Sequence, residues 1–302
     1  MTAPAVTDRA AALLGARVTG AHRIGGGDIA EAYRLALADG RAVFAKTLAA
    51  APDEFFEAEA AGLGYLAATG AVAVPEVHAV APGLILLEWI EPGPATPEAA
   101  EQLGRDLAAL HNTPAEAFGN PRPGHPAYIG SLPLPSPEHP VHPPASPADW
   151  PRFHADYRLL PFLRRATDNA ALTPADAAAV ERLCERLYDG DEQVSGPPQA
   201  PAAIHGDLWS GNVHFTSAGG RPYLIDPAAQ GGHPETDLAF LELFGCPHLE
   251  RITGAYEEVR PVSGRRARVP LHQLHHLLVH AALFGSAYGA QCGAAARAVL
   301  TQ

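Results

Sequence analysis

The order of hydrophobic and polar positions divides this chain into a strand-rich first part and a helix-rich remainder. Residues 29–48 hold two strand-like runs that meet at Asp39 and Gly40, a dipeptide suited to a two-residue hairpin turn. Residues 74–90 hold two more such runs on either side of Pro82 and Gly83. The first part of the chain is therefore predicted to form an antiparallel sheet.

Helical spacing of apolar residues first occurs within this strand-rich part. Residues 53–70 show it, with Asp53 as a predicted N-cap and Gly70 as a predicted stop. We expect this helix to cross the sheet. Beyond residue 93 the pattern is mainly helical, and its first helix is expected to open at Thr96 with Pro97 in the first turn.

The segment "EPG", residues 91–93, separates the two patterns and is expected to be a hinge. We predict an α+β fold of two lobes, with a small antiparallel sheet in an N-terminal lobe over residues 1–91 and a larger, mainly helical C-terminal lobe over residues 92–302. Residues 121–151 contain eleven prolines, and we expect no regular element in them. Such a long irregular segment tends to be a lid, a binding loop or a mobile stretch.

Composition restricts the class of protein. The chain has 302 residues, 47% of them apolar, and a net charge of −12, which suits a soluble globular protein. Because no Lys- or Arg-rich run is present, we expect neither a nucleic-acid partner nor binding to an anionic membrane. Three widely spaced cysteines, no signal-peptide pattern and no apolar run of membrane-spanning length favour a cytoplasmic location. The oligomeric state is not indicated.

One lysine stands out among the basic residues. Lys46 is the only lysine of the chain and falls on the second predicted strand. Since an ammonium and a guanidinium are not interchangeable, Lys46 is a candidate for a specific site, although it could also be an incidental surface lysine. Upstream, Gly25, Gly26 and Gly27 could bring backbone N–H groups to phosphate oxygens. They could equally form a plain turn, because the GxGxxG spacing is absent.

The stretch "HGDLWSGN", residues 205–212, places polar groups between apolar positions. Asp207 is followed five positions later by Asn212, and a short predicted hairpin then returns to Asp226. This arrangement is typical of phosphoryl transfer in protein-kinase-like enzymes, where the first aspartate orients the acceptor hydroxyl and the other two side chains hold magnesium. The alternative is that all three side chains only cap turns and a helix. The order of Lys46, the glycines and the hinge along the chain favours the kinase-like interpretation.

Longer motifs resemble those of the fructosamine kinase, or ketosamine 3-kinase, family. They are "GGGDIAEAYRL", "FAKTL", "FEAEAAGLGYL", "VPEV", "HGDLWSGNV", "LIDPA", "GHPETDLA", "LFG" and "AYEEVRPV", which together span nearly the whole chain. The resemblance implies the aminoglycoside phosphotransferase and protein-kinase-like fold. It also implies ATP- and magnesium-dependent phosphorylation of the 3-hydroxyl of a sugar attached as a ketoamine, on a small molecule or a protein amine. Phosphate at that carbon lies beta to the ketone and can be eliminated, so the implied role is deglycation.

The resemblance further implies roles for individual residues. It makes Asp207 the catalytic aspartate, Asn212 and Asp226 the magnesium ligands, and Lys46 the contact to the nucleotide phosphates, oriented by Glu59. The implied phosphate loop comprises Gly25, Gly26, Gly27 and Asp28. The implied adenine-binding segment comprises Glu88, Trp89 and Ile90, acting mainly through backbone groups.

Three departures from the family pattern are present. "AAQGGHPE" replaces a tyrosine pair before "GHRE", so Pro234 stands where many members have a basic residue, and "SLPLP" stands where "TPQ" is expected. Both bear on the specificity for the sugar and the amine, and not on the nucleotide chemistry. Asp28 occupies the place of a redox-active cysteine that some relatives carry.

Several polar residues of the C-terminal part have two interpretations. His233 and Glu235 could line the acceptor site or belong to a turn, and Asp237 is expected to cap the next helix and to brace the catalytic loop. Three histidines recur at i, i+4 spacing, namely His272, His276 and His280. They could chelate a metal, but packing of a leucine-rich helix explains the spacing better. His280 could instead reach the rim of the active site.

Three functions therefore remain open. The preferred one is a ketosamine 3-kinase that uses ATP and Mg²⁺. The nearest alternative is a small-molecule kinase of the same fold that acts on an aminoglycoside, choline or another alcohol. The third is an inactive nucleotide-binding scaffold, against which the complete set of Lys46, Asp207, Asn212 and Asp226 argues.

Overall fold

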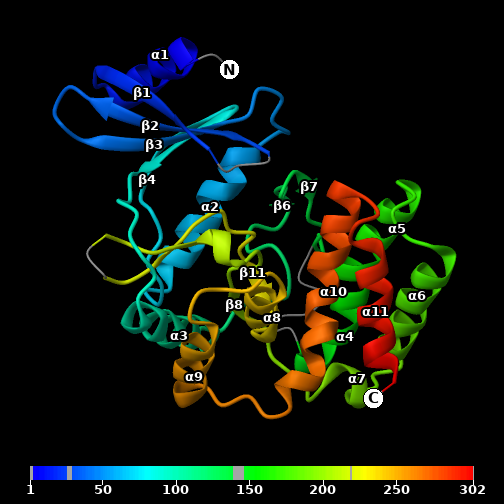
Figure 1. The fold of residues 1–302 in the computed structure, drawn as a ribbon. Coiled ribbons are helices and arrows are strands. Elements are labelled where there is room, and N and C mark those ends of the chain that lie inside the picture. Colours follow the sequence, from blue (N-terminus) through cyan, green and yellow to red (C-terminus); the bar gives the residue numbers. More distant parts are fainter. Residues whose placement is uncertain (1–2, 26–28, 139–145, 218–219, 302) are drawn as a thin grey trace.

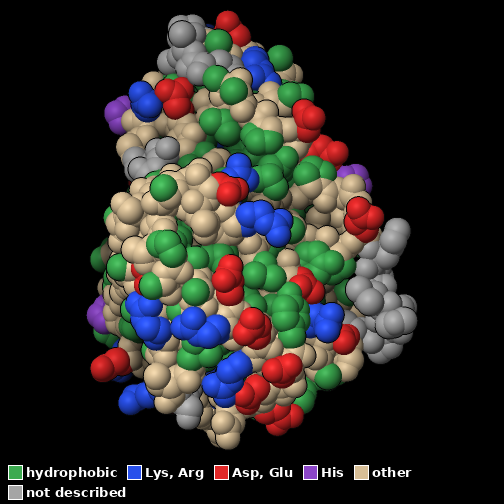
Figure 2. All heavy atoms as spheres, turned by 90° about the vertical axis from the view of Figure 1, so that its right-hand side faces the viewer, with side chains coloured by type: hydrophobic (Ala, Val, Ile, Leu, Met, Phe, Trp, Pro, Cys, Tyr) green, Lys and Arg blue, Asp and Glu red, His purple; other side chains and the backbone are tan. Residues whose placement is uncertain are grey.

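The computed structural model describes residues 3–25, 29–138, 146–217 and 220–301. Figure 1 shows a small sheet-containing lobe, drawn in blue and cyan, above a larger lobe built mainly of helices. The predicted α+β architecture, with an antiparallel sheet followed by a mainly helical part, is confirmed, whereas the division at residues 91 and 92 stays a prediction. On the face shown in Figure 2, acidic and basic side chains are interspersed with apolar ones.

The small lobe contains one antiparallel sheet with strand order β1-β2-β3-β5-β4. Its strands are β1 (Val18–Ile24), β2 (Glu31–Leu37), β3 (Ala42–Thr47), β4 (Val77–Ala81) and β5 (Leu84–Glu88). Two helices accompany it, α1 (Ala3–Leu14) and α2 (Phe55–Ala68). The hairpin between β2 and β3 turns at the predicted dipeptide, where Gly40 adopts a φ of 90°.

Alternation along β3 decides which side chains reach the centre of the molecule. Val43 and Ala45 are buried with Val6 and Ala10 of α1. Because successive residues of a strand point to opposite faces, Phe44 and Lys46 face the other side, where Phe44 packs with the cluster that contains Phe56 of α2. Lys46 is therefore directed toward α2 and the interior between the lobes.

The predicted N-cap of α2 is wrong by one residue. Glu54 holds the N-cap position in a left-handed conformation with a φ of 55°, and its side chain makes no capping hydrogen bond. The start of α2 is therefore set by the backbone conformation of Glu54, and Asp53 is not the N-cap. The stop is close to the prediction, since α2 ends at Ala68 and Gly70 has a φ of 66°.

The larger lobe begins at α3 (Pro97–His111), where Thr96 accepts a hydrogen bond from the backbone N–H of Ala99 as predicted. Its other long helices are α5 (Leu160–Asp168), α6 (Pro174–Tyr188), α8 (Glu235–Leu243), α9 (Leu249–Val259), α10 (Arg265–Phe284) and α11 (Gly289–Leu300). Short elements are α4 (Trp150–Phe153), a π-helical stretch (His154–Leu159) and α7 (Glu192–Ser195). Short strands are β8 (Ala202–Ile204), β9 (Val213–His214), β10 (Tyr223–Leu224) and β11 (Gln230–Gly232). Figure 1 places α3 beside α9, and α10 beside α11.

The expectation that residues 121–151 lack regular structure is wrong. A two-stranded ladder joins β6 (Tyr128–Ile129) to β7 (Leu132–Pro133), and a 3₁₀ turn occupies Pro147–Asp149. Proline suits both settings, because it is tolerated at sheet edges and in the first turn of a helix. Ser146 and Asp149 complete a capping box around that turn. Within the described ranges, no helix is long and apolar enough to cross a membrane.

Candidate active site

Buried hydrogen bonds hold the loop that carries Asp207. The carboxylate of Asp237, which is fully buried, accepts hydrogen bonds from the backbone N–H groups of His205 and Gly206, each at 2.8 Å. The Oδ2 atom of Asp237 also lies 3.0 Å from Nε2 of His111. Gly206 adopts a φ of 82°, and a Cβ atom there would lie 2.2 Å from the carbonyl oxygen of Ala228. Only glycine fits this turn, and the loop is fixed against the core.

The predicted bracing role of Asp237 is thus confirmed, but the predicted capping role is wrong. The N-cap of α8 is Pro234, which makes no side-chain capping hydrogen bond, and the first N–H of the helix, that of Glu235, donates instead to His233 Nδ1 at 3.2 Å. Asp237 lies inside the first turn, and both of its oxygens are directed to the catalytic loop.

Asn212 joins the two aspartates that the sequence singles out. Its Nδ2 donates to the backbone oxygen of Asp207 at 2.7 Å and lies 3.3 Å from the Asp207 carboxylate. The same nitrogen lies 3.4 Å from the backbone oxygen of Asp226. The β9–β10 hairpin brings these residues together, because Val213 pairs with Leu224 at its open end. Asp226 has a left-handed φ of 52°, a conformation that is costly for a residue with a side chain and clusters at functional sites.

Lys46 lies between two carboxylates. Its Nζ is 2.9 Å from Glu59 Oε2 and 2.9 Å from Asp226 Oδ1. The lysine and glutamate side chains are 15% and 9% exposed, whereas that of Asp226 is 41% exposed, so Asp226 presents its free oxygen to the cavity. The lone lysine is therefore not an incidental surface residue.

Burial and charge shift the pKa values of this group. Burial raises the pKa of Asp207 to about 7, helped by the negative charge of Asp226 and opposed by the Asn212 hydrogen bond and by Lys46. Burial likewise raises the pKa of Glu59 to about 7, against the opposing effect of Lys46. Burial would lower the pKa of Lys46, but the charges of Asp226 and Glu59 outweigh it and raise that pKa above its ordinary value. Carboxylates crowded around one ammonium suit a site that receives a further cation.

The donor atoms at the base of the cavity fit Mg²⁺. Asn212 offers its side-chain oxygen and Asp226 its exposed carboxylate oxygen, and hard oxygen ligands are the ones that this ion prefers. No group of three or more His, Cys, Asp or Glu side chains able to hold a metal occurs among the described residues, and the helix histidines do not form one. A magnesium ion bound by only two protein side chains would take its other ligands from water and phosphate oxygens.

One cavity of about 960 Å³ lies between the lobes and is lined by the five residues of this group: Lys46, Glu59, Asp207, Asn212 and Asp226. The implied adenine-binding segment, Glu88, Trp89 and Ile90, lines the same cavity, as does Gly25. The other members of the predicted phosphate loop, Gly26, Gly27 and Asp28, lie outside the described residues. The sequence-predicted nucleotide residues that the structure describes are thus brought to one place.

The cavity wall next to Asp207 is aromatic. Trp209, Phe244, His280, Phe284 and Tyr288 line it, from the catalytic loop, the end of α8, α10 and α11. Ring centroids of neighbouring members lie 6.4 Å apart for Trp209 and Phe244 and 5.0 Å apart for Phe244 and His280. Trp209, Phe244 and Phe284 are 40%, 41% and 50% exposed, so the wall is open to an incoming molecule. The expectation that His280 reaches the rim of the site is confirmed.

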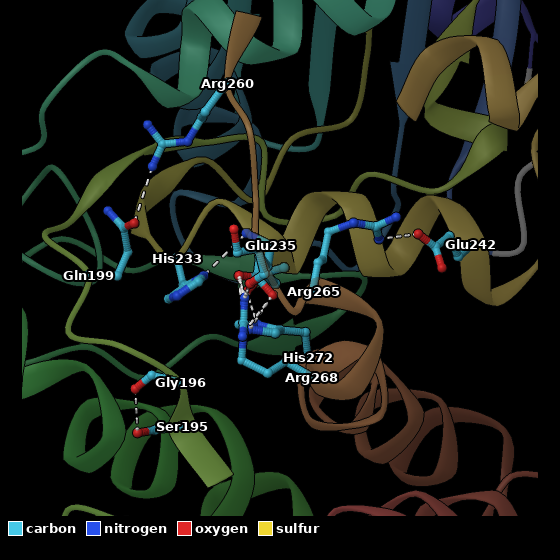
Figure 3. A network of polar contacts seen from close by, with 12 residues as sticks. Ser195, Gly196, Gln199, His233, Glu235, Glu242, Arg260, Arg265, Arg268 and His272 are labelled. Atoms are coloured by element: carbon cyan, nitrogen blue, oxygen red, sulfur yellow. Dashed lines mark hydrogen bonds and ion pairs between the residues drawn. The ribbon is translucent and has the colours of Figure 1, made fainter. Parts of the chain in front are cut away.

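His233 and Glu235 are not at the cavity. Figure 3 shows Glu235 between His233 and Arg268, and the Arg268 Nη2 atom lies 2.6 Å from Glu235 Oε1. The His233 ring lies 4.6 Å from Trp150 and 4.5 Å from His272, and burial lowers its pKa well below the ordinary value. Both residues are about 95% buried in a polar cluster of the helical lobe. The acceptor-site interpretation of these two residues receives no support from their positions.

Some residues of the site had no signal in the sequence. His111 hydrogen bonds to Asp237 and, through Nδ1, to the hydroxyl of Tyr256 at 3.0 Å, yet the chain separates it from these partners by 126 and 145 positions. Phe284 and Tyr288 join the wall only because α10 and α11 meet at their ends. No local periodicity or spacing could have identified these contacts.

The fold and the site define the class of protein as a phosphotransferase of the protein-kinase-like fold. Solved structures with low sequence identity share that fold over nearly their whole length. They include the aminoglycoside phosphotransferase APH(4)-Ia, with a TM-score of 0.63 at 18% identity over 98% of this chain and 99% of that one. The choline kinase LicA of Streptococcus pneumoniae gives a TM-score of 0.62 at 16% identity over 99% of both chains.

The chain belongs to the fructosamine kinase family, whose model matches residues 3–302. A protein of Thermus thermophilus named "Probable ketoamine kinase" is 36% identical over 87% of both chains. The chloroplastic protein-ribulosamine 3-kinase of japonica rice is 30% identical over 90% of this chain and 76% of that one. A crystal structure from Thermobifida fusca with the provisional name fructosamine-3-kinase has a TM-score of 0.88 at 43% identity and full coverage of both chains. The chain is therefore a kinase that acts on a hydroxyl group.

Proposed function

We propose that this enzyme transfers the γ-phosphoryl group of ATP to the 3-hydroxyl of a ketosamine, a sugar joined to an amine as a ketoamine. The single observation that carries the proposal is that Asp207, Asn212, Asp226 and Lys46 meet at one interlobe cavity in a chain of the fructosamine kinase family. The names of the relatives, ketoamine kinase and ribulosamine 3-kinase, support the acceptor class.

The small lobe would hold the nucleotide. Glu88, Trp89 and Ile90 would meet the adenine mainly through backbone groups, and the Gly25 segment would cover the phosphates. Lys46, kept in place by Glu59, would contact the phosphate oxygens as a compact positive charge. The hydrogen bonds that hold Asn212 and Asp226 would fix the position of the phosphates relative to Asp207.

Asp207 would orient the acceptor. Its carboxylate would accept a hydrogen bond from the 3-hydroxyl and take the proton as the new O–P bond forms. The bond between the γ-phosphorus and the bridging oxygen breaks at the same time, and ADP leaves with the electron pair. The Mg²⁺ ion, held by Asn212 and Asp226, would neutralise charge on the phosphates.

The aromatic wall would hold the sugar and its amine beside Asp207. Its exposed rings offer apolar surface to a small-molecule ketosamine and leave the rim open for a glycated protein side chain. The product carries phosphate beta to a ketone and can lose it, releasing the amine, so the reaction would serve deglycation. We place it in the cytoplasm, which suits the free thiols of Cys184, Cys246 and Cys292.

The test is ATP-dependent ADP release with a panel of acceptors: fructosamines and ribulosamines on free and protein amines, an aminoglycoside, and choline. We expect turnover with ketosamines that contain a free 3-hydroxyl, and none with the matched 3-deoxy compounds. Magnetic resonance of the product should show phosphorus coupled to the C3 proton. Turnover with the aminoglycoside or choline and not with any ketosamine would replace the proposed acceptor, and the absence of ADP release with every acceptor would indicate an inactive scaffold.

A further inference from the structure

A segment of the helical lobe reaches across to the start of α2. Residues 119–134, called the strap below, contain the β6–β7 hairpin and the beginning of the proline-rich stretch. The backbone N–H groups of Gly119 and Gly231 each donate to the carbonyl oxygen of the other, at 2.8 and 3.0 Å, which anchors the strap on β11. Figure 1 places β6 beside α2, and much of the strap lines the cavity between the lobes.

Successive residues of β6 join the strap to both lobes. Ile129 is buried in the hydrophobic core that contains much of α10. Tyr128, the residue before it, points to the opposite face and packs with the small-lobe cluster, where its ring lies 5.1 Å from that of Phe55. The Tyr128 hydroxyl donates to the backbone oxygen of Asp53 at 2.8 Å. The strap therefore connects the core of the helical lobe directly to the first turn of α2.

Two basic side chains of the strap meet at Glu54, the residue before α2. The Glu54 Oε2 atom lies 2.9 Å from His125 Nδ1 and 3.6 Å from Arg122 Nη2. Asn120 braces both, because its Oδ1 accepts from the backbone N–H of Arg122 at 3.0 Å and its Nδ2 donates to the backbone oxygen of His125 at 2.8 Å. Glu54 has a left-handed φ of 55°, a costly conformation that persists where the surroundings impose it. The contacts with the strap explain why Glu54 keeps it.

We propose that the strap holds α2 where Glu59 keeps Lys46 in place for phosphoryl transfer, an inference that rests on the proposed function. Glu59 lies five positions after Glu54, about one and a half turns into the helix, so a shift at the start of α2 moves its carboxylate. Glu59 Oε2 lies 2.9 Å from Lys46 Nζ, whereas Oε1 has no hydrogen-bond partner among the described residues. No second hydrogen bond of this carboxylate resists such a shift. The strap residues that contact the start of α2 are thus positioning residues, since they act on Lys46 through the helix.

Variants that detach the strap test this role. Glu54→Gln removes the charge at which its two basic side chains meet, Tyr128→Phe removes the hydroxyl bond to Asp53, and the strap variant combines both changes. Glu57→Gln is the matched control, because it neutralises another carboxylate in the first turn of α2 that does not line the cavity. The measurements are kcat and KM for the ketosamine, calorimetric affinity for MgATP, and thermal melting as a check on folding. The strap variant should lose kcat at least about fivefold with KM for the ketosamine within about twofold, and the control should match wild type.

A double-mutant cycle separates positioning from a general loss of stability. Glu59→Gln removes the charge through which the strap is proposed to act, so adding the strap variant to it should change kcat and MgATP affinity by less than about twofold further. Losses that multiply in the cycle, or a strap variant with the kcat of wild type, would overturn the inference. Both outcomes leave the proposed function intact, because wild type still phosphorylates the ketosamine. Failure of wild type to phosphorylate any ketosamine would instead remove the proposed function, and this inference with it.

Discussion

At the scale of single residues, the site depends on a balance of charge around Lys46. One ammonium lies 2.9 Å from each of two carboxylates, and the Glu59 Oε1 atom is buried without a hydrogen-bond partner among the described residues. Leaving a buried polar atom unpaired in this way costs stability, so its presence here points to a functional requirement. The arrangement has room for one compact charge at a fixed point, which a lysine supplies and an arginine does not.

Lys46→Arg tests this requirement. The longer, planar guanidinium should displace the Glu59 and Asp226 contacts, so turnover should fall by at least about tenfold, or ~1.4 kcal/mol in the barrier. The circular dichroism spectrum should stay that of the wild type. Steady-state kinetics with saturating MgATP and ketosamine measure the effect. Turnover near that of wild type would mean that any cation at this position suffices.

The raised pKa of Asp207 predicts a pH-dependent cost in stability. In the folded enzyme without nucleotide or metal the pKa is about 7, above the ordinary value of 3.8, so folding favours the protonated form. Between these two values the folded protein keeps the proton that the unfolded chain loses, so wild type should lose stability as the pH rises from about 4 to about 7, while Asp207→Asn, which cannot ionise there, should not. Thermal melting in a chelator should show the melting temperature of Asp207→Asn rising relative to that of wild type by ~2 °C or more between about pH 4.5 and about pH 7.5, with no further change above that pH.

The same comparison with Asp168→Asn, which changes an exposed aspartate at the end of α5, provides the control. This control should show no such pH dependence. If Asp207→Asn has the same melting temperature relative to wild type at both values of pH, the carboxylate is already ionised in the free enzyme and its environment is more polar than its burial indicates.

At the scale of elements, a junction joins the hinge, residues 91–93, to the β9–β10 hairpin, with the N–H of Gly93 donating to the backbone oxygen of Phe215 at 2.8 Å. It connects the segment proposed to hold adenine to the residues proposed to hold the metal. Gly93→Ala should separate these segments, because the added Cβ would lie 2.2 Å from the Thr216 oxygen. We expect KM for ATP to rise at least about fivefold and the melting temperature to fall, since a backbone contact cannot shift as a flexible side chain does.

Gly64→Ala is the matched control. Gly64 lies inside α2 with no atom within 4 Å of the added Cβ, so alanine should stabilise the helix by about 0.5–1 kcal/mol and leave KM unchanged. Kinetics and thermal melting of the two variants side by side give the result. An unchanged KM in Gly93→Ala would show that the junction does not position the nucleotide.

Local patterns predicted most helices and strands and the order along the chain of the proposed catalytic residues, but not the environment of each side chain. The β2–β3 hairpin, the Thr96 cap and the Asp207–Asn212 spacing depend on neighbouring residues, so they could be predicted from the sequence. The positions of His233 and Glu235 depend on the packing of α10 against α8, which no short stretch encodes. The same holds for the aromatic wall, whose members come from separate helices.

At the scale of the whole molecule, the two lobes contribute different residues to the proposed reaction. The small lobe supplies Lys46 and Glu59, the helical lobe supplies Asp207, and Asn212 and Asp226 lie where the two meet at the cavity. Each lobe by itself lacks part of the set. In the proposed reaction, the two aspartates perform different tasks although both contact Asn212.

The most direct test is to compare Asp207→Asn with Asp226→Asn in two assays, calorimetric affinity for MgATP and ketosamine-dependent ADP release. Asparagine preserves the shape of each side chain and tolerates the left-handed backbone at residue 226. Asp207→Asn should lose turnover by about a hundredfold or more and keep its MgATP affinity within a few-fold of wild type. Asp226→Asn should lose turnover and also bind MgATP at least about tenfold more weakly, because it removes a proposed metal ligand. Equal loss of MgATP affinity in the two variants, or an active Asp207→Asn enzyme, would contradict the account.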